Sequence, residues 1–238
     1  MHLHFAFSDK RDGNMSFRHE SQHDVDEHRR RFFAQYGIDL SSGVMMQLTH
    51  EDTITVVNSS DAGNGMTDSE TAVVTEALMT KTPGLVLCLL IGDCFPVIYY
   101  DRINNAVALA HLGWKPATLK LAGKVVRAMH TQHGSNLSDI SVIIGPGIHA
   151  QSYMLSDPLQ ATLPEWQSFI SETAPNTYAI DLLGFILNDL TQAGIIPENI
   201  DTSHTYDTAT NPAQFSHFRS DKTGEPEGRF LACAWMEE

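Results

Sequence analysis

The sequence has little cysteine, few basic side chains and no long hydrophobic run. Its 238 residues include three cysteines, an odd number that does not suggest a disulfide framework. The longest apolar run, residues 85–91, has the length of a strand and falls well short of the ~18 residues of a membrane helix. Lys and Arg number 15 against 29 Asp and Glu, a net charge of −14. A general nucleic-acid binder needs the opposite balance.

The first residues also lack a secretion signal, because no charged region followed by a hydrophobic segment opens the chain. We therefore expect a cytoplasmic protein without membrane or nucleic-acid partners, either a monomer or a small homo-oligomer. With 42% hydrophobic and 18% charged residues the chain is typical of a globular protein. It shows no internal repeat and no clear linker, so we expect one domain over residues 1–238.

Strand and helix patterns are mixed along the chain without a regular β-α-β rhythm. Strands are expected at residues 3–7, 44–49, 53–57, 85–91, 96–100, 106–111, 140–144 and 229–236. Helices are expected from Asp24 to Gly37, from Pro116 to about His133, and from a cap at Asp181 to Gly194. In the first helix Arg29, Arg30 and Arg31 are predicted to form a solvated face. Hairpin-like connections beside helical ones indicate an α/β fold with mixed sheets.

Three side chains with metal-ligating chemistry fall at the ends of expected strands. Cys94 directly follows one strand, His111 ends the second strand after it, and His50 follows residues 44–49. A Cys/His₂ set suits Zn²⁺ and leaves a fourth position for water or substrate. Two other interpretations stay open: the three are ordinary residues, or Cys94 and His111 form a nucleophile pair with Asp93 nearby.

Several short motifs follow one another in a fixed order. They are His50, G-D-C-x-P-V at 92–97 with Asp101 after it, H-x-G-W at 111–114, G-P-x-I at 145–148 with Tyr153, F-S-x-x-R at 215–219, and Gly228-Arg229. Together they resemble the laccase-domain, or polyphenol oxidase, family over roughly residues 43–236. Its members are better described as purine nucleoside phosphorylases with adenosine deaminase and methylthioadenosine phosphorylase activities. Some are known as peptidoglycan editing factors.

The resemblance implies a single-domain layered α/β sandwich with mixed β-sheets, similar to bacterial toxin hydrolases with a Cys/His pair. It implies one Zn²⁺ per chain, held by His50, Cys94 and His111, and makes residues 1–42 the more divergent part. The family's older label names a copper-dependent phenol oxidase. Such enzymes need many clustered histidines, and only three positions here have motif support, so copper is not expected.

The residues around these three positions depart from the family pattern. Leu48 and Glu51 replace a Gln and a Gly around the first histidine, and Lys115-Pro116 replaces Arg-Gly after H-x-G-W. A lysine keeps the positive charge of arginine but loses its planar fork of donors. Because the three proposed ligands are retained, these departures bear on the identity of the substrate more than on metal binding.

Roles for the remaining candidates follow from the chemistry that the resemblance implies. Cys94, His111 and Asp93 are the catalytic candidates; Asp93 would orient a ligand or accept a proton, or else only cap a turn. Phosphate needs cations, for which the motif segments offer Lys115, Arg219 and Arg229. The remaining substrate-pocket candidates are His149, Tyr153 and His217.

The leading hypothesis is a zinc-dependent enzyme of purine nucleosides. It would cleave adenosine, inosine or methylthioadenosine with phosphate, deaminate adenosine through a metal-activated water, or do both. One alternative is a hydrolase that uses Cys94 as nucleophile on a peptidoglycan precursor. Another is a divergent, non-catalytic module that keeps zinc as part of its structure or of a partner-binding surface.

Overall fold

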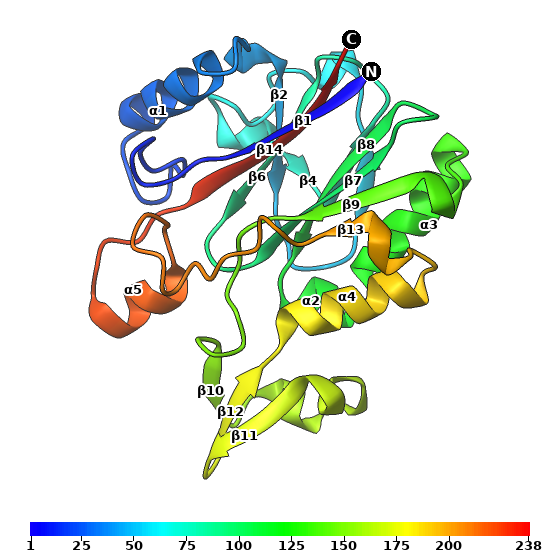
Figure 1. The fold of residues 1–238 in the computed structure, drawn as a ribbon. Coiled ribbons are helices and arrows are strands. Elements are labelled where there is room, and N and C mark those ends of the chain that lie inside the picture. The colour runs from blue at the N-terminus through cyan, green and yellow to red at the C-terminus, as the bar shows by residue number, and fades with distance from the viewer.

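Two β-sheets packed face to face form the centre of the computed structural model, which describes residues 1–238 (Figure 1). In order across the first sheet, the strands are β1 (His2–Phe7), β14 (Phe230–Glu237), β6 (Val86–Ile91), β2 (Gly43–Gln47) and β4 (Val73–Val74). In order across the second, they are β13 (Ile200–Asp201), β9 (Ile140–Ile144), β7 (Phe95–Asp101), β8 (Ala106–Leu112), β5 (Ala77–Thr80) and β3 (Ile54–Val56). Both sheets combine parallel and antiparallel pairs, as the sequence predicts.

Helices cover the outer face of each sheet. The first sheet carries α1 (Gln22–Ala34), and the second carries α2 (Trp114–Thr118), α3 (Leu121–His133) and α4 (Leu182–Gln192). A short α5 (His217–Thr223) precedes β14. The result is a helix–sheet–sheet–helix sandwich, which confirms the expected layered fold.

Strand β6 shows how the sequence builds these layers. Its side chains alternate, so that Leu87, Leu89 and Ile91 pack between the two sheets. Val86 and Cys88 point the other way and pack in the cluster that includes Phe32 and Phe33 of α1. A strand buried on both faces reads as an unbroken apolar run, which is why residues 85–91 are recognisable in the sequence.

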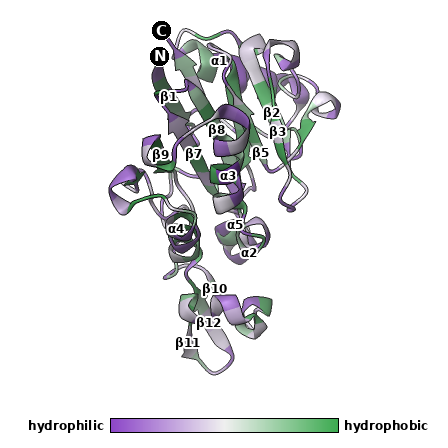
Figure 2. Ribbon diagram, turned by 90° about the vertical axis from the view of Figure 1, so that its right-hand side faces the viewer, coloured by the Kyte–Doolittle hydropathy of each residue, from purple (hydrophilic) through white to green (hydrophobic).

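A third, smaller sheet projects away from the sandwich below α2 and α4 (Figures 1 and 2). It consists of β10 (Met154–Ser156), β12 (Thr177–Ile180) and β11 (Ile170–Ala174), in that order. Trp166, between β10 and β11, is fully buried and stacks on Phe185 of α4, with 3.9 Å between the ring centroids. We call residues 154–180 the projecting arm.

Two helix predictions are corrected by the structure. The helix expected from Pro116 to His133 is two helices, because Lys120 adopts a left-handed conformation with φ of 61°. Helix α1 begins at Gln22, earlier than predicted, because Ser21 caps it by accepting a hydrogen bond from the backbone N–H of Asp24.

Arg29 is also misplaced by the sequence prediction, since it is 1% exposed. Consecutive residues of a helix are about 100° apart, so three arginines in a row cannot share one face. Arg29 falls on the buried side with Val25, Phe32 and Phe33, whereas Arg30 and Arg31 are exposed.

None of the helices combines the length and the hydropathy that crossing a membrane requires.

Candidate functional site

Three connections pass from the first sheet to the second, and two of them carry predicted ligands. The connection from β2 to β3 contains His50, and the connection from β6 to β7 contains Cys94. Strands β2 and β6 are parallel neighbours, so both connections begin at the same edge of the first sheet. The backbone is left-handed at His50, with φ of 63°, and at Asp93, with φ of 87°. Such non-glycine conformations are sparse and concentrate at functional sites.

His111 reaches the same edge from the second sheet. Strands β7 and β8 form the predicted hairpin, in which Pro96 pairs with His111, so the end of β8 lies beside Cys94. A Cβ atom added to Gly113 would lie 2.9 Å from Cys94 Sγ and 3.4 Å from the His111 ring. Glycine at position 113 therefore leaves room where these two side chains meet. The rings of His50 and His111 are 5.4 Å apart and nearly perpendicular. His111 thus lies beside both Cys94 and His50.

Glu76 connects the two histidines, and the sequence analysis missed it. One carboxylate oxygen is 2.6 Å from His111 Nδ1, and the other accepts the backbone N–H groups of Thr49 and His50. Glu76 is fully buried just before β5, which pairs with β8 and so places Glu76 opposite His111. An acidic residue at the start of the apolar stretch 77–79 is the signal that could have revealed it.

The local charges set the protonation of this cluster. Burial alone would lower the pKa of His111, but Cys94 and Glu76 outweigh it and raise that pKa to about 9. The pKa of His50 is lowered, first by burial and then by the positive charge of His111. His111, which is surrounded by hydrogen-bond acceptors, thus favours its protonated form, whereas His50 favours its neutral form.

The residues present fit a zinc ion chemically. His111 is bound through Nδ1 to a carboxylate, which is the usual arrangement for a histidine that ligates metal through Nε2. A thiol and a second imidazole complete a set of donors that zinc prefers. As the side chains are placed, no group of three His, Cys, Asp or Glu residues is close enough to surround an ion.

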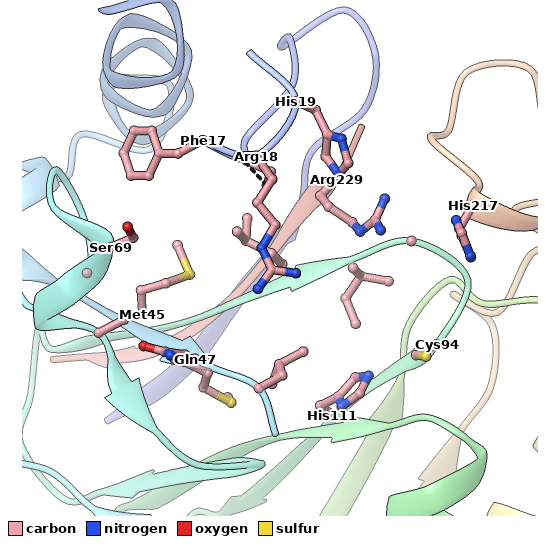
Figure 3. Close-up of a pocket in the computed structure, with 18 of the residues that line it drawn as sticks. Phe17, Arg18, His19, Met45, Gln47, Ser69, Cys94, His111, His217 and Arg229 are labelled. Atoms are coloured by element: carbon pink, nitrogen blue, oxygen red, sulfur yellow. Dashed lines mark hydrogen bonds between the residues drawn. The ribbon is translucent and has the colours of Figure 1, made fainter. Parts of the chain in front are cut away.

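These three side chains line a cavity of about 820 Å³ at the edge of the sandwich (Figure 3). This volume suits a small organic ligand. The wall also includes Phe17, Arg18, His19, Met45, Gln47 and Ser69. Among the lining residues Glu70 is the only acid, against three arginines and four histidines. A locally cationic cavity in a chain of net charge −14 favours an anionic ligand.

Two of the remaining predicted site residues reach the cavity, His217 and Arg229. Each contacts Glu227: His217 Nδ1 lies 2.8 Å from its carboxylate, and Arg229 Nη2 donates to it over 2.7 Å. The predicted residues that do not line the cavity are Asp93, Lys115, His149, Tyr153 and Arg219.

Asp93 and Arg219 are held in structural contacts instead. The Asp93 carboxylate accepts from the Thr208 hydroxyl and from the backbone N–H of Phe218, both at 2.7 Å. Both contacts are long-range and fix the segments around residues 208 and 218 to the turn that contains Asp93. Arg219 donates to Glu225 and to four backbone carbonyls between residues 208 and 214, so its guanidinium braces that loop.

The other three lie around the site. Lys115 is exposed, with its ammonium 5.6 Å from the Trp114 ring. His149 stacks on Phe95 with 6.2 Å between ring centroids. Burial, followed by the nearby Cys94, raises the pKa of Tyr153 to about 12, which keeps its hydroxyl protonated next to the cluster.

Arg18 and His19 are cavity residues that the sequence did not single out. They lie in the polar stretch 9–23, which carries no motif. The structure brings this stretch to the site through backbone contacts: Met15 N–H donates to the Arg229 carbonyl, and Arg229 N–H donates to Asn14 Oδ1. Long-range pairing of this kind leaves no local signal in a sequence.

The chain is similar in sequence to a known protein family and to several named proteins. Residues 8–237 match the model of a family described as multi-copper polyphenol oxidoreductase laccase. The protein named purine nucleoside phosphorylase YlmD of Bacillus subtilis (strain 168) is 29% identical over 230 residues, which cover 92% of this chain and 80% of that protein. The protein of the same name from Geobacillus stearothermophilus is 33% identical over 225 residues, covering 90% and 80%.

Solved structures agree with these relationships over nearly the whole chain. The crystal structure of the Bacillus licheniformis hypothetical protein YfiH superposes with a TM-score of 0.90 at 27% identity, covering 99% of this chain and 93% of that one. The structure of YlmD from Geobacillus stearothermophilus gives a TM-score of 0.86 at 31% identity, covering 94% and 85%.

Proposed function

Because the chain belongs to the multi-copper polyphenol oxidoreductase laccase family, we propose that it is a zinc-dependent purine nucleoside phosphorylase. Its substrates would be adenosine, inosine or methylthioadenosine, together with phosphate. The observation that carries the proposal is the cavity in which His50, Cys94 and His111 lie next to cationic side chains. Two relatives named purine nucleoside phosphorylase, at 29% and 33% identity, support it.

Phosphorolysis makes two demands on the site. Phosphate attacks C1′ of the ribose, the bond from C1′ to the purine nitrogen breaks, and the leaving purine takes up a proton. Cations in the cavity offset the charge of phosphate in a protein that is acidic overall. Imidazole groups such as His217 offer a proton donor at the cavity wall.

His50, Cys94 and His111 would hold the zinc ion, and Glu76 would keep His111 oriented for it. Bound there, zinc supplies Lewis-acid chemistry at the cavity wall. Adenosine deamination is a second reaction of this same proposal, in which water replaces the amino group at C6 and ammonia leaves.

A nucleoside panel tests the proposal directly. The purified protein is incubated with adenosine, inosine and methylthioadenosine, each with and without inorganic phosphate, and the products are separated by chromatography. Release of free purine and a ribose 1-phosphate only when phosphate is present supports phosphorolysis. Inosine formed from adenosine without phosphate assigns deamination. No turnover of any nucleoside by zinc-loaded protein contradicts both.

The contact of Cys94 with His111 favours a second candidate, a hydrolase with a thiolate nucleophile. Because the pKa of His111 is raised to about 9, an imidazolium is favoured beside the thiol, and this in turn favours the thiolate. Such an enzyme, acting on a peptidoglycan precursor, would keep its activity in a chelator and lose it to iodoacetamide. A zinc enzyme would lose its activity to the chelator and regain it when zinc is added. Zinc retained without any activity would indicate a non-catalytic module.

A further inference from the structure

One cationic side chain in the cavity has no partner. The backbone N–H of Arg18 donates to Ser16 Oγ over 3.3 Å, and no atom of its guanidinium takes part in a hydrogen bond or an ion pair. Arg18 is solvent-exposed, and Figure 3 shows its side chain extending from its loop into the cavity. A free, planar fork of five donors is therefore presented to whatever occupies this space.

The other arginines of the cavity are already engaged. Arg29 donates to the carbonyls of Met15, Gly65 and Met66. Arg229 donates to Glu227 over 2.7 Å and to the Gly228 carbonyl over 2.8 Å. Arg18 is thus the arginine of the cavity that is available to a ligand.

The loop that carries Arg18 is well supported. Phe17 lies against the buried guanidinium of Arg29, with 4.3 Å between Cζ and the ring centroid. Two residues earlier, the backbone N–H of Met15 donates to the carbonyl of Arg229, just before β14. A side chain on a fixed loop loses less entropy when it binds a ligand than one on a mobile loop.

The side chains beside Arg18 are mostly basic. His19, His217 and Arg229 line the same part of the cavity wall in Figure 3. Burial lowers the pKa of His19; the charges of Arg229 and Arg18 lower it further, and the charge of Glu227 opposes them. Glu70 is the single acid among the lining residues, and the Glu227 carboxylate behind them is held by His217 and Arg229.

We propose that Arg18, flanked by Arg229 and His19, binds a phosphoryl group in this cavity. The guanidinium fork matches two oxygens of a phosphate. This inference rests on the proposed function and deepens it, because it assigns the phosphate of the reaction to Arg18. The group can come from two sources, free inorganic phosphate as co-substrate or the phosphate ester of a nucleotide.

Kinetics of Arg18→Gln provide the first test. With inosine saturating, we expect the KM for inorganic phosphate to rise at least tenfold, while the KM for inosine changes less than threefold. Arg18→Lys keeps the charge without the fork, so its KM for phosphate should lie between those of wild type and Arg18→Gln. The matched control is Arg102→Gln, which removes an exposed charge in the β7–β8 turn, at the opposite end of β8 from His111. An unchanged phosphate KM in Arg18→Gln overturns the inference.

A binding measurement separates this inference from the proposed function. Inorganic phosphate and AMP are each titrated into the full-length protein at constant ionic strength, and the melting temperature is followed. A rise in wild type that is lost in Arg18→Gln and kept in Arg102→Gln supports the site, even if no nucleoside is turned over. The ligand that produces the rise identifies the source. If neither ligand raises the melting temperature of wild type, or if Arg18→Gln responds as wild type does, the inference is wrong.

Discussion

At the scale of single residues, the site depends on a buried carboxylate that no motif contains. Glu76 holds His111 through Nδ1 and the backbone of His50 through its other oxygen. Removal of its charge would weaken the orientation of both imidazoles at once. Partners of this kind tune metal affinity nearly as strongly as the ligands themselves.

We therefore expect Glu76→Gln to weaken zinc binding by about 10- to 100-fold. The amide is a poorer acceptor for the His111 N–H and cannot serve both contacts equally well. Competition against a chromogenic chelator measures the affinity. Glu70→Gln is the matched control, since Glu70 lines the cavity and its carboxylate has no partner. Equal zinc affinities of Glu76→Gln and wild type would show that Glu76 does not contribute to metal binding.

Zinc itself is tested by cysteine variants. We expect one zinc and no copper per chain by elemental analysis of the purified protein, and loss of the zinc in Cys94→Ala. Cys88→Ala should keep it, because Cys88 is buried between β6 and α1, away from the cavity. Copper in the wild-type protein, or zinc retained equally in both variants, would contradict the ligand set.

The sequence predicts this site unevenly, for a physical reason. His50, Cys94 and His111 come together because strand ends meet at sheet edges, which local patterns indicate. Glu76 has only the weak signal of an acid before the apolar stretch 77–79. Arg18 has no such signal, because it reaches the site through the docking of its loop. Arg219 shows the converse: its motif position points to phosphate, whereas its guanidinium supports the loop around residues 208–214.

At the scale of elements, α1 matters to the cavity although it lies behind the first sheet. Its Arg29 is buried, and every hydrogen bond of the guanidinium goes to the backbone carbonyl of Met15, Gly65 or Met66. The helix thereby fixes two loops that form the cavity wall. A buried charge is stable only when its donors are satisfied in this way.

Arg29→Met tests the role of this helix. The apolar side chain fills part of the volume but leaves three carbonyls without their donors, so we expect a loss of about 2–4 kcal/mol in the free energy of unfolding. Urea denaturation followed by circular dichroism measures it. Arg30→Met, on the exposed face of the same helix, should change stability by less than about 0.5 kcal/mol. A loss below about 1 kcal/mol in Arg29→Met would argue against this bracing role.

Helices and strands are predicted correctly from the sequence where a single local pattern, such as an apolar run, determines the structure. Strands β6, β7, β8 and β9 follow apolar runs, and the structure places them within one or two residues of the expected bounds. The break between α2 and α3 was missed, because left-handed Lys120 has no propensity signal and serves to redirect α3 onto the second sheet. Tertiary packing overrides local preference at such a residue.

At the scale of the whole molecule, the sandwich and the projecting arm differ in how they are stabilised. Strands β7 and β8 are almost entirely buried, whereas four of the five residues of β11 are exposed. The arm is anchored by Trp166, which stacks on Phe185 and donates from Nε1 to Thr118 Oγ1 over 2.9 Å. Segments with few buried contacts open at lower free energy than a core.

Hydrogen exchange should therefore resolve two units. In wild type we expect the amides of β10, β11 and β12 to exchange faster than those of β7 and β8. Trp166→Ala removes the anchor, at a cost typical of a buried tryptophan, about 3–5 kcal/mol, and should raise exchange throughout the arm while the strands of the sandwich stay protected. Leu159→Ala is the control, because Leu159 lies in the same arm and is 58% exposed. If Trp166→Ala accelerates β7 and β8 as much as the arm, the molecule unfolds as one cooperative unit, and the arm is part of the core rather than docked on it.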